Sequence, residues 1–119
     1  MTPISDQTRL IHILDRIDRI QYAESILTET DQEEEAREES QVVFDAILYD
    51  LVVIGEAVKS LSIELKERYS LIPWVEISDM RNILAHEYFR VEAVVVRATI
   101  DEPLAQLKNI CEEALKKAK

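Results

Sequence analysis

The sequence predicts an all-α protein, and three observations support this fold class. The 119-residue chain contains one glycine and three prolines, too few turn formers for a sheet of short strands. Hydrophobic residues make up 47% of the chain, too many for a disordered protein. Apolar residues also recur at spacings of three and four, the pattern of one face of an α-helix. We therefore expect one helical domain over residues 1–119.

The first helix is expected over residues 4–28, with an apolar stripe on one side and charged residues on the other. The stripe contains Leu10, Ile13, Ile17, Ile20 and Leu27, and the charged side contains Asp15, Arg16, Asp18 and Arg19. Residues 29–40, ETDQEEEAREES, follow without an apolar period and with mostly one sign of charge. We interpret this acidic segment as solvated, either a helix extension or a linker. It keeps the protein soluble or guards a binding site electrostatically.

A second helix is expected to begin at Ser40, whose side chain can cap it, and to run to Leu65. Its apolar positions follow helical spacing and are Phe44, Ile47, Leu48, Leu51, Ile54, Val58, Leu61 and Leu65. Val43, Val52, Val53 and Ala57 widen this surface beyond one stripe. A helix that is apolar over so much of its girth has to be covered on several sides, by the same chain or by a partner. Homodimerisation is the inference that we draw.

Gly55, the single glycine, lies in the middle of this second helix, where glycine costs about 1 kcal/mol relative to alanine. We expect it to allow another backbone to approach closely. Glu56, beside it, either faces solvent or is directed at a site, and the sequence leaves both options open.

Two more helices complete the predicted bundle. Pro73 suits the first position of a third helix, because its fixed φ fits there and its missing N–H is not needed. The last helix is expected from Glu92 onward, and Pro103 is expected to kink or break it near Asp101. Cys111, with no second cysteine in the chain, is expected in the core.

Charge and cysteine content narrow the function classes. The formal net charge of −10 repels polyphosphates, so RNA binding would need a local basic cleft. One cysteine cannot form an intramolecular disulfide, and neither an N-terminal signal-like run nor a long uncharged apolar run occurs. We therefore expect a cytoplasmic protein that does not span a membrane.

The stretch DMRNILAHEYFRV, residues 79–91, concentrates Arg81, His86 and Tyr88 in a few positions. On one continuous helix Arg81 and Tyr88 share a face, whereas His86 lies about 140° round from Arg81. The three converge if the helix ends near His86, or if two copies of the motif face each other across a dimer interface. Arginine can bind a phosphate through two hydrogen bonds, and histidine titrates near neutral pH. Together they suit metal-independent cleavage of RNA through its 2′-hydroxyl; the alternative is that they only cap the helix end.

The segments IGEAVKSLS and IPWVEISDMRNILAHEYFRV resemble the HepT-like branch of the HEPN superfamily, also catalogued as DUF86. The family motif is arginine, a polar residue, histidine after four intervening positions, then one residue and tyrosine. Here it is Arg81, Asn82, His86 and Tyr88. The resemblance covers nearly the whole chain, although the acidic residues 29–39 match no family feature.

This resemblance implies a homodimeric bundle of four or five helices, with both motifs lining a cleft at the dimer interface. Proteins of this group are toxins of type II toxin–antitoxin systems and act as endoribonucleases that need no metal or cofactor. Their partner is an MNT-domain nucleotidyltransferase antitoxin, which in some pairs transfers AMP to the tyrosine of the motif.

Carried over residue by residue, Arg81 would stabilise the phosphate, His86 would act as general base or acid, and Asn82 would position them. Tyr88 would accept AMP or contact RNA, or else would only pack against the helix end. AMP on Tyr88 would add bulk and negative charge beside Arg81.

Two other functions remain open from the sequence. The chain could be a non-catalytic helical binding partner of a nucleotidyltransferase, which its acidic charge would suit. It could also be a HEPN dimer that retains only structural interactions, although the complete motif argues against this.

Overall fold

The structure is a computed structural model that describes the backbone of residues 4–30, 35–87 and 93–117 and the side chains of residues 5–26, 42–82 and 103–117. This part of the chain forms five α-helices, namely α1 (Ile4–Thr30), α2 (Glu35–Lys59), α3 (Ile63–Arg68), α4 (Trp74–Glu87) and α5 (Ala93–Lys117). The described residues contain no strand, which confirms the all-α prediction. None of the described helices has an apolar stretch long enough to cross a lipid bilayer.

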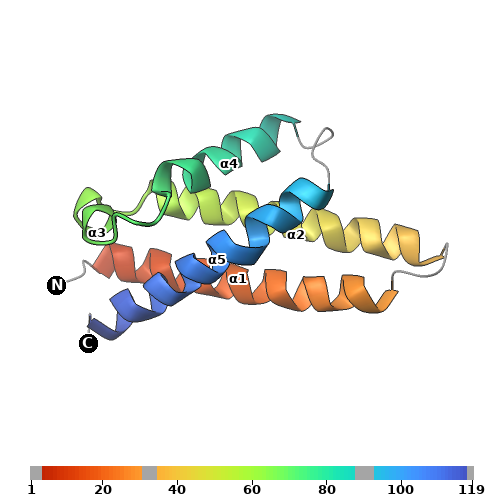
Figure 1. Cartoon of the computed structure of the whole chain (residues 1–119), viewed down its shortest axis with the longest axis horizontal. Coiled ribbons are helices and arrows are strands. Elements are labelled where there is room, and N and C mark those ends of the chain that lie inside the picture. Colours follow the sequence, from red (N-terminus) through yellow and green to blue (C-terminus); the bar gives the residue numbers. More distant parts are fainter. Residues whose placement is uncertain (1–3, 31–34, 88–92, 118–119) are drawn as a thin grey trace.

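α1 and α2 are long helices that lie side by side and run in opposite directions (Figure 1). α4 packs against α2, and α5 packs across α1. The two ends of the chain lie at the same end of the molecule, whose extents are 51 × 27 × 21 Å. The helix that carries Arg81 is therefore joined to the bundle mainly through α2.

The core contains apolar residues from all five of the described helices and from the turns beside α3. They are Leu10, Ile13, Ile17, Ile20, Ile47, Leu48, Leu51, Ile54, Val58, Leu61, Leu65, Ile72, Trp74, Ile77, Leu104, Leu107, Cys111 and Ala114. The apolar stripe predicted for the first helix is confirmed, since its first four members have no exposed surface. Its fifth member, Leu27, lies outside the described side chains.

The second helix begins earlier than the sequence suggests. α2 starts at Glu35, so Ser40 lies inside the helix and the prediction that it caps the helix is wrong. The segment EAREES is rich in glutamate, alanine and arginine, which all favour helix, and it extends α2 rather than preceding it. The side chains of residues 27–41 lie outside the described part of the chain, so their predicted solvation stays a prediction.

The second helix also ends earlier, and the prediction of one helix up to Leu65 is wrong. α2 ends at Lys59, and the short helix α3 follows. Ser62 caps α3 by accepting a hydrogen bond from the Leu65 N–H at 3.2 Å. Asp6 of α1, which is 1% exposed, accepts from the Ser62 N–H at 3.0 Å and from its hydroxyl at 2.5 Å. These hydrogen bonds replace the backbone bonds that would continue α2 as a helix. The apolar residues Leu61 and Leu65, which led to the prediction of a longer helix, are nevertheless buried.

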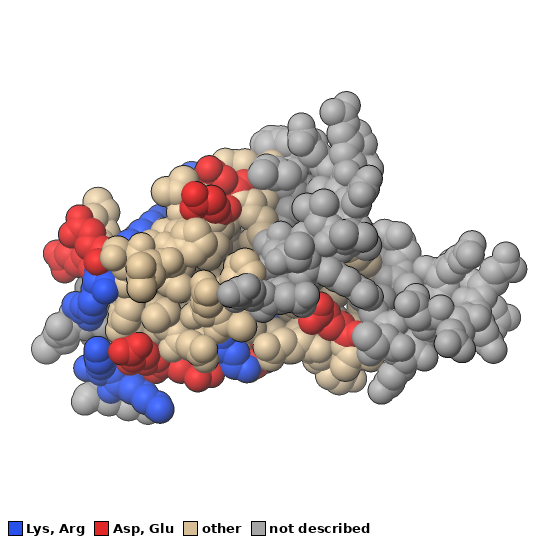
Figure 2. Space-filling model, viewed as in Figure 1, with Lys and Arg blue, Asp and Glu red and all other residues tan. Residues whose placement is uncertain are grey.

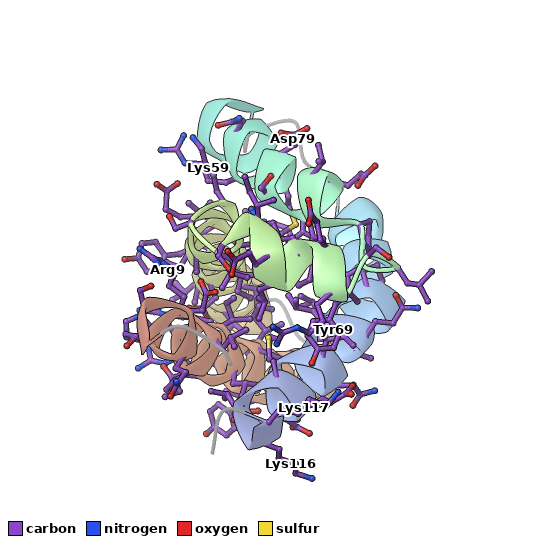
Figure 3. All side chains as sticks on the ribbon, turned by 90° about the vertical axis from the view of Figure 1, so that its left-hand side faces the viewer. Arg9, Lys59, Tyr69, Asp79, Lys116 and Lys117 are labelled. Carbon is purple, nitrogen blue, oxygen red and sulfur yellow. The ribbon has the colours of Figure 1, made fainter. Side chains whose placement is uncertain are left out.

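The connection between α3 and α4 is fixed by a tryptophan. The Trp74 indole N–H donates to the carbonyl of Lys66 at 3.1 Å and to that of Tyr69 at 3.0 Å. Tyr69 lies at the end of the molecule that faces the viewer in Figure 3. α4 begins at Trp74, directly after Pro73, whose carbonyl accepts from the Ile77 N–H at 3.1 Å. The predicted start of this helix is therefore correct to one residue.

α5 runs through Pro103, so of the two predicted outcomes a break is wrong, and a kink near Asp101 stays a prediction. The lost hydrogen bond is outweighed by burial, because Leu104, Leu107 and Cys111 are all in the core on this helix. The expectation that Cys111 is a core residue is confirmed, and burial raises the pKa of its thiol to about 12.

The sequence predicts that Arg16 faces solvent, but in the structure its side chain contacts α2. Its Nη1 donates to Asp50 Oδ1 at 2.8 Å, and its guanidinium lies 5.5 Å from the centre of the Tyr49 ring. Asp50 is 6% exposed, and its hydrogen bond raises the pKa of Arg16. This residue therefore links α1 to α2, while Asp15, Asp18 and Arg19 are exposed as predicted.

Candidate active site

Arg81 lies at the edge of the contact between α4 and α2. Trp74 and Ile77 on the same helix are buried, and Met80 packs against the core. The Arg81 side chain comes next and is 40% exposed. The buried residues therefore fix the backbone of α4, while the guanidinium group of Arg81 reaches solvent.

The packing of α2 against α4 is tight at Gly55. A Cβ atom on this residue would lie 2.8 Å from the Cβ of Arg81, 3.2 Å from the Arg81 nitrogen and 3.2 Å from the Ile77 carbonyl oxygen. Two of these three atoms belong to the backbone and cannot rotate aside. The prediction that Gly55 permits another backbone to approach is confirmed, and that backbone is the one that carries Arg81.

Glu56, the next residue, pairs with Arg81. Its Oε2 lies 3.1 Å from Arg81 Nε, and its side chain is 58% exposed. The sequence left open whether Glu56 faces solvent or a site, and in the structure its side chain is exposed and pairs with Arg81, a predicted site residue. Sequence reasoning missed this pair; the available signal was a glycine in the middle of a helix, next to an acidic residue.

Asn82 also contacts the guanidinium group of Arg81. Nη1 of Arg81 donates to Asn82 Oδ1 at 3.1 Å. Arginine has five N–H donors in a planar fork, and these two acceptors engage Nε and one donor of Nη1. Among the described residues Nη2 has no acceptor. The edge formed by Nη1 and Nη2 can therefore bind a phosphate through two hydrogen bonds.

His86 lies on the same helix as Arg81, and α4 continues past it to Glu87. Five residues along a continuous helix correspond to a rotation of about 140° and a rise of about 7.5 Å. The backbone positions of Arg81 and His86 therefore lie on different sides of α4, and α4 ends at Glu87, near His86, as one of the two predicted geometries requires. The side chain of His86 and all of Tyr88 lie outside the described residues, and their predicted roles stay predictions.

The described surface carries charges of both signs (Figure 2), and the formal net charge of the whole chain is −10. On the face shown in Figure 2, acidic side chains are spread along the molecule, whereas basic ones gather mainly at the end where both termini lie. Within the described ranges, no group of three or more His, Cys, Asp or Glu side chains could hold a metal ion. In the described part of the site, α4 presents one arginine, Arg81, whose guanidinium group contacts the side-chain oxygens of Glu56 and Asn82.

Comparison with known proteins gives one family match and several related sequences. The family model HepT-like, described as ribonuclease HepT-like, matches residues 10–114. A predicted RNase of Caldanaerobacter subterraneus subsp. tengcongensis is 41% identical over 78 residues, covering 66% of this chain and 70% of that protein. A predicted RNase of Methanocaldococcus jannaschii is 32% identical over 100 residues, covering 83% and 86%. A predicted ribonuclease HepT of Thermococcus cleftensis is 37% identical over 71 residues, covering 60% and 64%. No solved structure matches the chain.

Proposed function

Because this chain belongs to the HepT-like ribonuclease family, we propose that it is a metal-independent endoribonuclease and the toxin of a type II toxin–antitoxin pair. The observation that carries the proposal is the presentation of Arg81. Its backbone packs against Gly55. Glu56 contacts Nε and Asn82 contacts Nη1 of its guanidinium group, and Nη2 has no acceptor among the described residues. A cation fixed in this way can stabilise charge on a phosphoryl group without reorganising during the reaction.

The proposed reaction is a transesterification within the RNA. His86, as general base, removes the proton of a 2′-hydroxyl, and the resulting oxygen attacks the adjacent phosphorus. Arg81 stabilises the negative charge on the phosphoryl oxygens, and the 5′-oxygen of the next nucleotide leaves with a proton from a general acid. The products are a 2′,3′-cyclic phosphate and a 5′-hydroxyl. The nucleophile belongs to the RNA, so the reaction requires neither a protein nucleophile nor a metal ion.

We place the complete site at a homodimer interface. The backbone positions of Arg81 and His86 in one chain lie about 140° apart around α4, whereas the His86 of a second copy could face Arg81 across a two-fold axis. The outer side of α2 offers a surface for this contact. Val42 and Tyr49 are 69% and 61% exposed and seven positions apart, and Glu56 follows at the same spacing. A dimer contact along this stripe would bring the Glu56–Arg81 pair to its edge.

The proposed antitoxin is an MNT-domain nucleotidyltransferase that transfers AMP to Tyr88. Tyr88 follows Arg81 by seven positions in the sequence. The phosphate of a bound AMP would carry negative charge into the surroundings of Arg81 and compete with RNA for it. Modification would therefore inhibit cleavage by occupying the phosphate site.

One experiment tests these proposals together. The chain is expressed with and without its genomic neighbour, its intact mass is measured, and each form is incubated with total RNA in excess EDTA. We expect the unmodified form to cleave RNA and leave 2′,3′-cyclic phosphate ends. The co-expressed form should carry AMP on Tyr88 and leave the RNA intact. His86→Ala and Arg81→Ala should each lower the cleavage rate at least about 100-fold, while Arg68→Ala, an exposed arginine of α3, should not.

Three results would contradict these proposals. Equal RNA cleavage and growth inhibition by His86→Ala would exclude the proposed general base. Loss of activity in EDTA would exclude the metal-independent reaction. Inhibition by the neighbour without any mass increase would exclude AMP transfer as the means of neutralisation.

A second function is favoured by the net charge of −10, since an acidic surface suits a basic protein partner better than RNA. In this alternative the chain is a non-catalytic binding partner of the nucleotidyltransferase. An unmodified dimer that cuts no RNA but forms a stable complex with the neighbouring gene product would favour it.

A further inference from the structure

We infer that Glu56 is a positioning residue for RNA cleavage, which orients the guanidinium group of Arg81 so that its Nη1–Nη2 edge meets the scissile phosphate. The inference rests on the proposed ribonuclease function and adds a residue from α2 to a motif that lies on α4. It is carried by the packing at Gly55 and by the two contacts of the Arg81 side chain.

The backbone of Arg81 has little freedom to move relative to α2. A methyl group on Gly55 would come within 2.8 Å of the Arg81 Cβ and within 3.2 Å of the Arg81 nitrogen. The two helices are thus packed together at the level of their backbones. Any group on α2 next to Gly55 is therefore held at a constant distance from the base of the Arg81 side chain.

Glu56 is the residue of α2 that follows Gly55 and contacts the Arg81 side chain. Its Oε2 lies 3.1 Å from Arg81 Nε, while the two side chains are 58% and 40% exposed. An ion pair this exposed contributes little to stability, because water screens the attraction and both side chains lose freedom. Its main effect is on orientation, since it restricts a long side chain that would otherwise sample many rotamers.

The contacts of Arg81 with Glu56 and Asn82 determine which of its N–H groups can bind a ligand. Glu56 engages Nε, and Asn82 accepts one hydrogen bond from Nη1. Nη1 carries a second N–H group, and Nη2 carries two. Because Glu56 engages Nε, two parallel hydrogen bonds to a phosphate are left to the terminal Nη1–Nη2 edge, where Nη2 has no acceptor among the described residues. Glu56 therefore occupies the donor that phosphate binding can spare.

The charge of Glu56 gives this role a kinetic signature. A carboxylate beside Arg81 repels RNA, so removing it should strengthen RNA binding and lower KM. Releasing the guanidinium group should at the same time misalign it in the transition state and lower kcat. A residue that served only folding would lower the active fraction without lowering KM.

The test compares three variants in the full-length protein. Glu56→Ala should lower kcat at least about tenfold and should also lower KM. Glu56→Gln keeps an oxygen that can accept from Nε but loses the charge, so kcat should stay within about threefold of wild type while KM falls. Glu67→Ala, an exposed acid of α3, makes the same change in net charge and should leave kcat unchanged.

A second measurement reports on the orientation itself. The Nε–H signal of Arg81 is followed in ¹H–¹⁵N spectra and assigned by its loss in Arg81→Lys. It should be slow to exchange with solvent in the wild type and in Glu67→Ala, and should shift and exchange faster in Glu56→Ala.

The inference is wrong if Glu56→Ala keeps the wild-type kcat, or if the Arg81 signal is the same in both proteins. The failure of the proposed function looks different. In that case the wild type cuts no RNA although the Arg81 signal depends on Glu56, which leaves the pair intact but overturns its role in RNA cleavage.

Discussion

At the scale of single residues, Gly55 and Arg81 set the geometry of the candidate site. Position 55 has no room for a side chain, because a Cβ atom there would lie 3.2 Å from each of two backbone atoms of α4, the Arg81 nitrogen and the Ile77 carbonyl oxygen. Arg81 depends on this contact, because its guanidinium group is presented from a backbone that Gly55 allows to lie against α2. The site is therefore sensitive to a residue that touches no substrate.

We predict that Gly55→Ala destabilises the protein, although alanine is the better helix former by about 1 kcal/mol. Overpacking against the backbone of α4 costs about 1–3 kcal/mol and should outweigh this gain. Chemical denaturation checks the free energy of unfolding. Ala46→Gly, at an exposed position of the same helix, measures the propensity difference alone. A Gly55→Ala protein at least as stable as wild type would show that α2 and α4 are not packed this closely.

At the scale of elements, the break between α2 and α3 is made by hydrogen bonds rather than by proline or glycine. Ser62 caps α3, and the buried carboxylate of Asp6 binds both the N–H and the hydroxyl of Ser62. Asp6 belongs to α1, so the start of the first helix fixes the turn that leads to α4. This turn then sets the position from which α4 returns along α2.

We predict that Asp6→Ala lowers the free energy of unfolding by about 2–3 kcal/mol, because it leaves two donors of the partly buried Ser62 without their acceptor. Asp15→Ala is the matched control on the same helix. Asp15 is exposed and pairs with the exposed Arg19 at 3.3 Å, so its loss should cost less than about 1 kcal/mol. Equal effects of the two substitutions in thermal or chemical unfolding would show that the Asp6 contacts do not stabilise the turn.

At the scale of the whole molecule, the helices cover α2 unevenly. α1 and α4 pack on two of its sides, while Val42 and Tyr49 stay exposed on the outer side. The wide apolar surface that the sequence assigns to this helix is thus mostly covered within the chain, and a narrower stripe is left over. This stripe is the surface that we propose for a second copy.

We predict that Tyr49→Glu makes the protein monomeric and abolishes RNA cleavage, because it places a charge in the proposed interface and separates the two motifs. Light scattering after size-exclusion chromatography gives the oligomeric state. Tyr22→Glu is the control, since Tyr22 is 71% exposed and lies on the outer side of α1. A Tyr49→Glu protein that remains dimeric and active would place the interface elsewhere.

The sequence by itself determined the all-α class, most of the buried residues of the first and second helices, and the core position of Cys111. These properties follow from the spacing of apolar residues, which burial enforces along each helix separately. It also located a close backbone approach at Gly55, because only a packing requirement explains glycine in the middle of a helix.

Only the tertiary structure decided where α2 ends, whether Pro103 interrupts α5, what Arg16 contacts and which way Glu56 faces. Each of these depends on a partner distant in sequence, such as Asp6 for Ser62, Asp50 for Arg16 and Arg81 for Glu56. Local periodicity carries no information about such partners, because it reports which side of a helix is buried and not which helix covers it. The motif on α4 predicted Arg81 as a phosphate ligand. It did not predict the ion pair of Arg81 with Glu56, because this pair depends on how α2 and α4 pack together.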